Sequence, residues 1–249
     1  MEKWTIDSVD LNVANLENMT DFYTRHIGLK ILNQTADMVE LGADTVLLRL
    51  YRLQNPKPMK MSGLYHFALL VPERKVLAEI LVSLYQKGLL GGASDHGYSE
   101  ALYLNDPEGN GIEIYCDNPQ NQWDIREDGQ IEGVTEEIDA QGLIALASEP
   151  FEFFPDGTKM GHVHLMVRDL QKTQSFYNDL GFDLKSDYGS QAKFFAHGLY
   201  HHHIGANTWH GLLPERQEDH MGVRMIHLNL DVDHAYETVD PSGIVLSIK

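Results

Sequence analysis

The chain carries histidines and a glutamate at positions where they could hold a catalytic metal ion. Thirteen of its 249 residues are histidines, which is more than usual. Three of them, His66, His162 and His227, begin segments whose alternating residues predict strands. Glu113 stands within an apolar segment that also predicts a strand. Two imidazoles and one carboxylate on one side of a metal ion leave its other side open, as a catalytic site requires.

The composition limits the kinds of partner that we expect. Acidic residues outnumber basic ones by 37 to 19, giving a formal charge of −18, and no cluster of Lys or Arg interrupts that balance. We therefore expect no nucleic acid and no anionic membrane as partner, because both need a basic surface. The single cysteine, Cys116, rules out an internal disulfide and a cysteine-rich zinc site. Because no apolar run has the length of a signal peptide or a membrane span, we expect a cytoplasmic protein.

An internal repeat indicates which elements position these residues. Residues 11–16 return as residues 165–170, and both copies are followed at the same offset by a Phe-Tyr pair in a predicted helix. A fainter repeat matches residues 66–71 with residues 227–232. All four segments open with an alternating strand. The chain is therefore predicted to contain four modules of a strand, a helix and further strands, at about 5–60, 61–118, 158–213 and 220–249.

The four modules fall into two halves. We expect a first module pair over residues 1–118, a connecting segment over residues 119–157 and a second module pair over residues 158–249. The connecting segment is acidic and rich in Gly, Asp and Gln, which is typical of a linker. The fourth module is truncated, because the stretch between its opening strand and its Asp-Pro-Ser-Gly turn is too short to hold the helix expected in the second module.

Two segments carry a resemblance to a known superfamily. Residues 102–113 read Leu-Tyr-Leu-Asn-Asp-Pro-Glu-Gly-Asn-Gly-Ile-Glu, and residues 200–205 read Tyr-His-His-His-Ile-Gly. With the repeated strand openings and the Phe-Tyr helix, they resemble the vicinal-oxygen-chelate superfamily, which includes glyoxalase I, antibiotic-resistance proteins and extradiol dioxygenases. The two segments together resemble its catechol 2,3-dioxygenase branch. The resemblance implies an α+β fold in which tandem βαβββ modules form two curved mixed sheets, with the fourth module truncated.

The resemblance also implies where metal ligands lie, at the first position of the opening strands and at the Glu of the closing strand. Pairing the first module with the second puts Ser8 beside His66 and Glu113, which is one ligand short. Pairing the third with the fourth is also one short, because Ser247 stands where the closing Glu should be. Pairing the second module with the third gives a complete set of His66, Glu113 and His162. We therefore expect this pairing if a metal is bound.

The activity implied by the resemblance is extradiol cleavage of a catechol-like aromatic diol by dioxygen, with Fe(II), or Mn(II) as the alternative ion. His202 matches the acid/base histidine of the family best, and His201 and His203 should point to the other face of the same strand. His96 and Tyr103 match a histidine and a tyrosine that contact the substrate oxygens. A homo-oligomer is also expected from the resemblance, since dimers and tetramers are common on this fold.

Two other functions stay open from the sequence. The first is a metal-dependent lyase or isomerase of the glyoxalase type, which usually has a second metal carboxylate, and the sequence offers none beside Glu113. The second is a small-molecule-binding protein of the resistance type on the same fold, without catalysis. Loss of part of the fourth module keeps this second alternative open, because it can remove a pocket wall. His227 lacks a carboxylate partner, so we expect no metal there.

Overall fold

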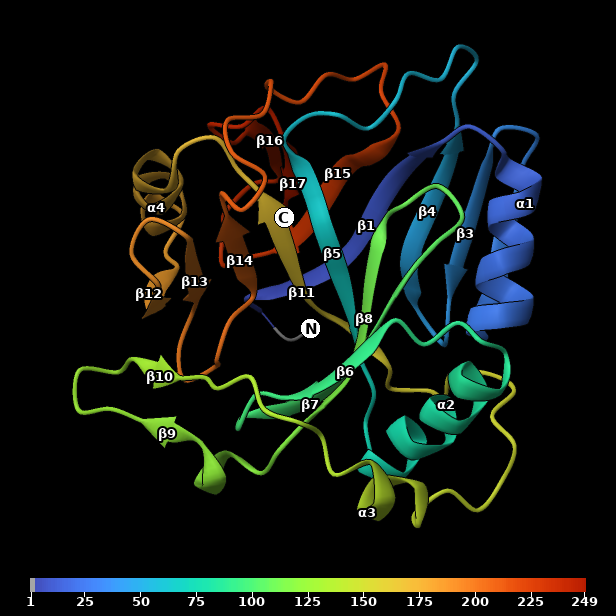
Figure 1. The fold of residues 1–249 in the computed structure, drawn as a ribbon. Helices are drawn as coiled ribbons and strands as arrows, with labels where there is room; N and C mark the ends of the chain where they lie inside the picture. Colours follow the sequence, from blue (N-terminus) through green and yellow to red (C-terminus); the bar gives the residue numbers. More distant parts are fainter. Residues whose placement is uncertain (1–2) are drawn as a thin grey trace.

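The computed structural model describes residues 3–249, and it has the two curved mixed sheets expected of the α+β fold (Figure 1). The first module comprises β1 (Thr5–Val13), α1 (Leu16–Asp21), a π-helical turn η1 (Phe22–Ile27), β2 (Lys30–Gln34), β3 (Met38–Gly42) and β4 (Val46–Arg52). The second comprises β5 (Gly63–Leu70), α2 (Arg74–Gln86), β6 (Gly92–Asp95), β7 (Ser99–Asn105) and β8 (Gly111–Asp117).

The second half repeats this order and then shortens it. The third module comprises β11 (Lys159–Met166), α4 (Leu170–Asp179), β12 (Asp183–Asp187), β13 (Ala192–Ala196) and β14 (Ile204–Asn207). The fourth module, which is described throughout, has β15 (Gly222–Asn229), β16 (Tyr236–Val239) and β17 (Val245–Ile248) without a helix. Its predicted truncation is therefore confirmed.

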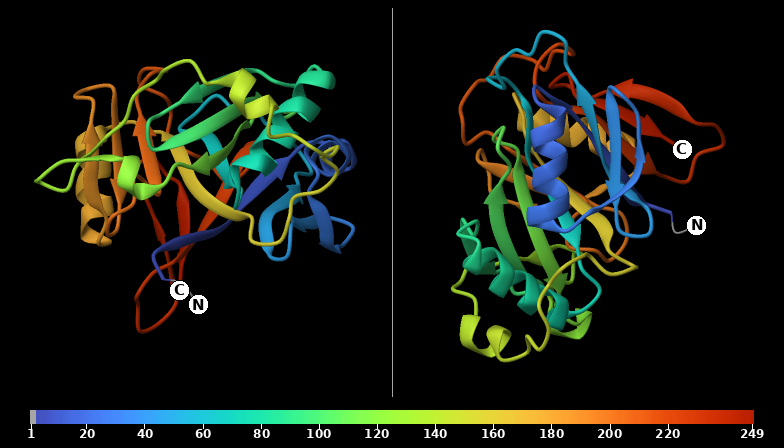
Figure 2. Two further views of the ribbon diagram at one scale, coloured as in Figure 1. Left: turned by 90° about the horizontal axis from the view of Figure 1, so that it is seen from below. Right: turned by 90° about the vertical axis from the view of Figure 1, so that its right-hand side faces the viewer.

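The segment between the halves contains short elements. They are η2 (Gln120–Gln122), β9 (Asp124–Ile125), β10 (Ile131–Glu132) and α3 (Ala140–Ile144). β9 and β10 form a small ribbon that projects from the body, while α3 packs beside α2 (Figure 2). Among the described residues, no helix is long and apolar enough to cross a membrane.

Each sheet takes strands from both halves of the chain. The eight-stranded sheet has the order β12-β13-β14-β11-β5-β8-β7-β6, so the second module pairs with the third through β5 and β11. The seven-stranded sheet has the order β16-β17-β15-β1-β4-β3-β2, so the first module pairs with the fourth. Both central pairs are antiparallel. The second module thus pairs with the third, as the expected ligand set of His66, Glu113 and His162 requires.

Alternation along β5 and β11 separates an apolar core from a polar face. Phe67 and Leu69 on β5, and Val163 and Leu165 on β11, are buried in the main hydrophobic core. The intervening side chains point to the opposite face of the sheet because successive residues of a strand alternate. That face carries the histidines of both strands. Burial of the apolar side chains on the core face therefore fixes the register that aligns the polar ones.

The Asp-Pro-Glu-Gly turn after β7 links the two sheets, although its sequence predicted only a turn. The hydroxyl of Tyr23 donates a 2.7 Å hydrogen bond to Asp106 Oδ2, and both residues are buried. The carboxylate of Glu108 accepts hydrogen bonds from the backbone N–H groups of Ala14 (2.9 Å) and Asn15 (2.8 Å). The start of α1 is thereby held against the turn that precedes β8.

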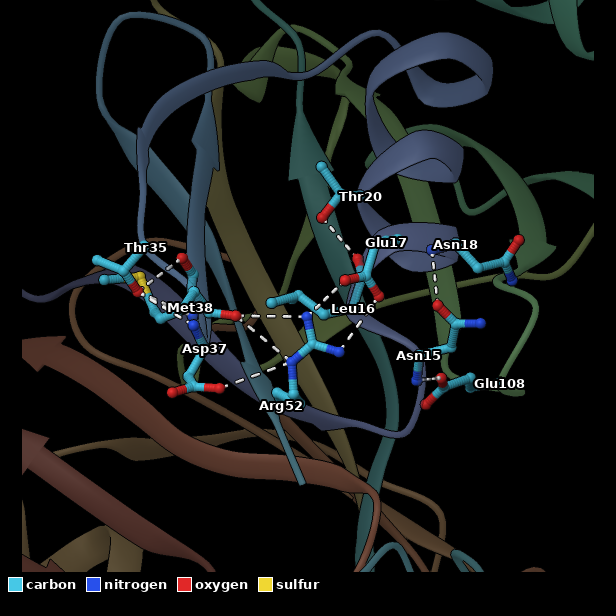
Figure 3. A network of polar contacts seen from close by, with 11 residues as sticks. Asn15, Leu16, Glu17, Asn18, Thr20, Thr35, Asp37, Met38, Arg52 and Glu108 are labelled. Atoms are coloured by element: carbon cyan, nitrogen blue, oxygen red, sulfur yellow. Dashed lines mark hydrogen bonds and ion pairs between the residues drawn. The ribbon is translucent and has the colours of Figure 1, made fainter. Parts of the chain in front are cut away.

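Polar contacts also fix α1 on its own module (Figure 3). The side chain of Asn15 caps the helix by accepting a 3.0 Å hydrogen bond from the N–H of Asn18. Arg52 at the end of β4 pairs with Glu17 on α1 at 2.6 Å and with Asp37 beside β3 at 3.6 Å. One guanidinium thus joins the helix to two strands of the module.

The equivalent Asp-Pro-Ser-Gly turn of the fourth module holds a carboxylate with an unusual environment. Asp240 Oδ1 accepts hydrogen bonds from the N–H groups of Ser242 (2.8 Å) and Ile244 (2.9 Å), while Oδ2 is buried without a partner. Burial, assisted by the charge of Glu215, raises the pKa of Asp240 to about 6 from 3.8. The unfolded chain loses this proton near pH 4, whereas the folded chain keeps it until about pH 6. Stability therefore falls by on the order of 3 kcal/mol as the pH rises through that window.

We predict that Asp240→Asn stabilises the protein at pH 8 and has little effect at pH 4.5, because the amide keeps the Oδ1 acceptor without the buried charge. Urea unfolding midpoints at the two pH values measure the effect. Asp187→Asn is the control of opposite sign, since the hydrogen bond from Lys193 lowers the pKa of Asp187. An equal gain from Asp240→Asn at both pH values would contradict the prediction.

Candidate functional site

Three side chains from neighbouring strands converge in the middle of the eight-stranded sheet. His66 on β5, Glu113 on β8 and His162 on β11 are all buried, and one ligand atom from each lies within 4.8 Å of the other two. β5 is the central strand of the three, because β11 and β8 pair with its two edges (Figure 1). The structure thus brings together the three residues that the resemblance named.

Small residues beside the cluster leave room for it. Ala68 is paired with His162 across one edge of β5 and with Glu113 across the other, so only a methyl group stands between them in this row. Gly161 lies at a shift in the β5–β11 ladder, directly before His162. A Cβ atom at Gly161 would lie 1.8 Å from the hydroxyl of Tyr115. Glycine is therefore required where β11 passes that ring.

The charge distribution in the cluster suits a divalent cation. His162 Nε2 donates a 3.2 Å hydrogen bond to Glu113 Oε2. His66 Nε2 lies 3.0 Å from the same oxygen, but it is buried and has no hydrogen-bond partner among the described residues. Burial alone would raise the pKa of Glu113, but the two imidazoles, His162 foremost, outweigh it and hold that pKa well below its usual range. An anionic oxygen and two imidazole nitrogens that face one another fit a metal ion.

A cavity of about 540 Å³ opens beside the cluster on the same face of the sheet. Its lining includes all six residues that the sequence named for the site, which are His66, His96, Tyr103, Glu113, His162 and His202. They come from four strands of two modules and from two loops. A cavity of this size is within the range of small-molecule sites.

His96 and Tyr103 form a hydrogen-bonded pair on one side of the cavity. His96 Nδ1 is 2.8 Å from the carbonyl oxygen of Val134, to which it must donate. Nε2 of the neutral ring then accepts the 2.6 Å hydrogen bond from the Tyr103 hydroxyl. Burial and the charge of Glu113 raise the pKa of Tyr103 well above its usual range, so the hydroxyl stays protonated. Val134 of the connecting segment thus fixes the orientation of the His96 ring, and His96 in turn fixes that of the Tyr103 hydroxyl.

His202 lines the cavity on the other side, next to the metal cluster. The centroid of its ring lies 4.1 Å from that of His162. Burial, together with the surrounding histidines, lowers the pKa of His202 well below its usual range. The ring is therefore neutral before a diol binds.

The expectation that His201 points away from His202 is wrong. β14 begins only at Ile204, so the three histidines before it do not alternate as residues of a regular strand do. His201 is buried, its Nε2 donates to Asp117 Oδ1 (2.9 Å), and its Nδ1 lies 2.8 Å from Nδ1 of His202. His203 packs elsewhere, with its ring centroid 6.0 Å from that of Phe182.

Sequence reasoning missed Asp117, which ends this chain of contacts. A carboxylate only accepts hydrogen bonds, so Nε2 of His201 carries a proton, and in the neutral form of this ring Nδ1 accepts from Nδ1 of His202. Nε2 of His202 is then the nitrogen that is free toward a ligand. The signal was present, because Glu113, Tyr115 and Asp117 share one face of β8 by alternation.

The other sheet carries a different arrangement at the corresponding positions. His227 is paired in register with Ser8 on one side and with Ser247 on the other. Arg49 donates to Ser8 Oγ at 2.8 Å and lies 3.3 Å from Asp10, whose carboxylate is 3.0 Å from His227 Nε2. A guanidinium and a carboxylate therefore occupy this row, and Asp10 lies beside His227, whose Nε2 makes no hydrogen bond to the described residues. No metal-ligand cluster lies there among residues 3–249.

Comparison with known proteins decides the family. A family model described as the Glyoxalase/Bleomycin resistance protein/Dioxygenase superfamily matches residues 5–114 and 159–244. The chain belongs to that superfamily. A relative from Bacillus subtilis (strain 168), named Catechol-2,3-dioxygenase, is 41% identical over 209 residues, which cover 81% of this chain and 73% of the relative.

Solved structures share the fold of this superfamily member at low sequence identity. The match to a solved structure of a Bacillus subtilis protein covers 100% of this chain and 86% of that protein's chain, with a TM-score of 0.67 and 13% identity. The match to the structure of glyoxalase I from Zea mays covers 98% of this chain and 91% of the glyoxalase chain, with a TM-score of 0.56 and 14% identity. At these identities the likeness concerns the fold alone.

We predict that Gly161→Ala destabilises the protein by about 1–3 kcal/mol, because the added methyl group overlaps the Tyr115 hydroxyl in a fully packed region. Gly92→Ala on β6 of the same sheet is the matched control, since no atom lies within 4 Å of its Cβ position. Chemical unfolding of both variants measures the difference. Equal stability of the two variants would show that β11 can move away from Tyr115 at no cost.

Proposed function

We propose that this superfamily member is an Fe(II)-dependent extradiol dioxygenase that cleaves a catechol-like aromatic diol. The observation that carries the proposal is the convergence of two imidazoles and one carboxylate on a cavity that also contains the His96–Tyr103 pair and His202. The relative named Catechol-2,3-dioxygenase supports it, because the identity of 41% extends over most of the chain.

His66, Glu113 and His162 would hold the iron as a set of two histidines and one carboxylate. Such a set is typical of non-haem Fe(II) oxygenases, and the bound ion supplies the centre at which an aromatic diol and dioxygen meet. One carboxylate and two neutral imidazoles leave a net positive charge on a divalent ion, which favours a diol in its anionic form. Mn(II), a soluble cytoplasmic location and a homo-oligomer stay predictions.

Tyr103 positions one oxygen of the diol in this proposal. Its hydroxyl remains protonated at neutral pH, and it is directed by the hydrogen bond to His96. Its one proton is donated to His96, so the hydroxyl oxygen is left to accept a hydrogen bond from an O–H group of the diol. His96 acts through Tyr103 and is fixed in turn by the carbonyl group of Val134.

His202 would take the proton that the diol loses on binding. Nε2 of His202 is the nitrogen left free by the contact of Nδ1 with His201. Once Nε2 is protonated, the positive ring still donates from Nδ1 to His201, which is itself held by Asp117. The chain of contacts therefore keeps the ring of His202 in one orientation before and after proton transfer.

Ring cleavage accounts for the ligand set better than glyoxalase-type isomerisation does. The cluster in the described part of the chain contains a single carboxylate, Glu113, whereas isomerases of the superfamily usually have a second one. Oxygen uptake with catechol, compared with turnover of a hemithioacetal by the same metal-loaded protein, tests the choice. Turnover of the hemithioacetal alone would reject the dioxygenase proposal.

We predict that protein prepared without oxygen binds about one Fe(II) per chain, and that His66→Ala, Glu113→Ala or His162→Ala each abolish tight binding. Each substitution removes one of only three ligands. Elemental analysis after desalting measures the metal content. His227→Asn is the matched control on the other sheet and should keep wild-type metal content. Normal iron content in the His162→Ala variant would rule out this site.

A second prediction concerns proton transfer. His202→Ala should keep iron and still bind catechol, while turnover falls by roughly 10²–10⁴, the usual contribution of a positioned proton-transfer group. His201→Ala should cause a smaller loss, because the ring of His202 remains but is no longer held. His203→Gln is the control, since that side chain packs away from the cavity. Oxygen uptake with catechol, corrected for iron content, measures all three. Unchanged turnover in the His202→Ala variant would assign the proton transfer to another group.

A further inference from the structure

One end of the cavity is formed by four rings that have no part in the reaction proposed above. We call Tyr65, His164, Phe194 and Trp209 the aromatic subsite. The ring centroids of Tyr65, Phe194 and Trp209 lie 5.3, 5.3 and 5.2 Å from that of His164, all in edge-to-face contact. Tyr65 and Trp209 are also in edge-to-face contact at 5.3 Å. All four line the same cavity as the metal cluster.

The strands place the aromatic subsite next to the metal cluster. His164 is paired with His66 across the β5–β11 ladder, and their ring centroids are 5.1 Å apart. The ladder shifts between this pair and the pairing of Leu165 with Leu64, so Tyr65 falls in a bulge. A bulge can turn a side chain toward the face that regular alternation would deny it. Tyr65 accordingly lies among the rings that line the cavity.

His164 offers the aromatic subsite a polar atom without a partner. The side chain is buried, with 4% of the residue exposed, and Nε2 makes no hydrogen bond to any described residue. It is not one of the three metal ligands. Behind it Gly205 has no side chain, and a Cβ atom there would lie 3.0 Å from the ring. His164 lines the cavity, and a hydrogen-bonding group of a ligand that reaches Nε2 would satisfy that nitrogen.

Among the described residues, the cavity offers neither an ammonium nor a guanidinium group to an anionic substituent. Within residues 3–249, neither Lys nor Arg lines it, although Glu113 does. The chain as a whole has a formal charge of −18. A carboxylate on the ring of the diol would therefore lose water without a guanidinium or ammonium group to pair with, which is costly.

The cavity is larger than a bare diol requires. Its volume of about 540 Å³ suits a drug-sized ligand, whereas catechol has only eight non-hydrogen atoms. A ring held at the metal cluster therefore leaves the aromatic subsite free for a substituent. The exposed part of Trp209, 49% of the residue, places that ring at the outer edge of this region.

We propose that the substrate is an aromatic diol that carries an uncharged, oxygen-bearing substituent, bound between Tyr65 and Trp209 with a hydrogen bond to His164. This inference rests on the proposed function, and it assigns the substrate class of that site. The flat rings contact the substituent, Nε2 of His164 pairs with its oxygen, and the absence of Lys and Arg from the described lining disfavours a carboxylate in its place.

The test compares ring substituents of matched size on metal-loaded protein without oxygen. The probes are catechol and its derivatives with an ethyl, a hydroxymethyl or a carboxylate group, each as the 3- and the 4-substituted isomer. Calorimetry gives their dissociation constants. Because a hydroxyl both donates and accepts, the hydroxymethyl probe can pair with either tautomer of His164. We expect it to bind most tightly and the carboxylate to bind at least about tenfold more weakly.

Variants separate the polar contact from the aromatic one. His164→Leu should remove the preference for hydroxymethyl over ethyl, and His164→Asn should retain part of it. Trp209→Ala should weaken both substituted diols by about tenfold and leave catechol within about threefold. Tyr85→Ala is the control, because Tyr85 is an exposed ring on α2 that lies outside the cavity. Metal content and the near-ultraviolet circular dichroism of each variant are measured beside the affinities.

The outcomes distinguish this inference from the proposed function. Cleavage of catechol with equal affinity for the neutral and the carboxylate probe would overturn the inference and leave the dioxygenase intact. The same holds if His164→Leu weakens all probes equally, or if Trp209→Ala affects catechol as much as its derivatives. Absence of ring cleavage with the predicted order of affinities would instead reject the dioxygenase and support the aromatic subsite as a binding site.

Discussion

The buried carboxylate of Glu113 is the group around which the eight-stranded sheet is arranged. An ionised carboxylate in the interior of a sheet is costly unless it is paired, and His66 and His162 are the groups that pair with it. Neither histidine is on the same strand, and they reach it from β5 and β11. The second and third modules must therefore lie together, with Ala68 between them as the small residue that lets the three side chains meet.

Much of this arrangement could be predicted from the sequence, because it depends on periodic features. The repeated strand openings indicated four modules, and the missing ligand at Ser8 indicated which of them pair. The contacts that could not be predicted lie where periodicity fails. His201 lies in a loop before β14, and Tyr65 lies in a bulge, so alternation assigns both to the wrong side. Asp117 could have been found, because it continues the period of two from Glu113 along β8.

The two sheets show how one module can serve two purposes. In one sheet, histidines and a glutamate face one another and suit a cation. In the other, Arg49 is itself the cation, and Asp10 and Glu40 pair with it at 3.3 and 2.9 Å. The guanidinium is always charged and always present, so this sheet needs no bound ion to balance its carboxylates. Repeated modules can thus keep the same backbone while one row of side chains is closed by an internal ion pair.

The crossing of strands between halves also determines when the molecule can complete its fold during synthesis. As the first half leaves the ribosome, β1 and β5 each expose an edge whose partner, β15 or β11, has not yet been made. Both central pairings join residues far apart in the sequence, and such contacts form slowly because a long loop must close first. The nascent first half therefore has two incomplete sheets, with one unpaired strand edge on β1 and another on β5. Those two edges stay unpaired until β11 and β15 of the second half have been made.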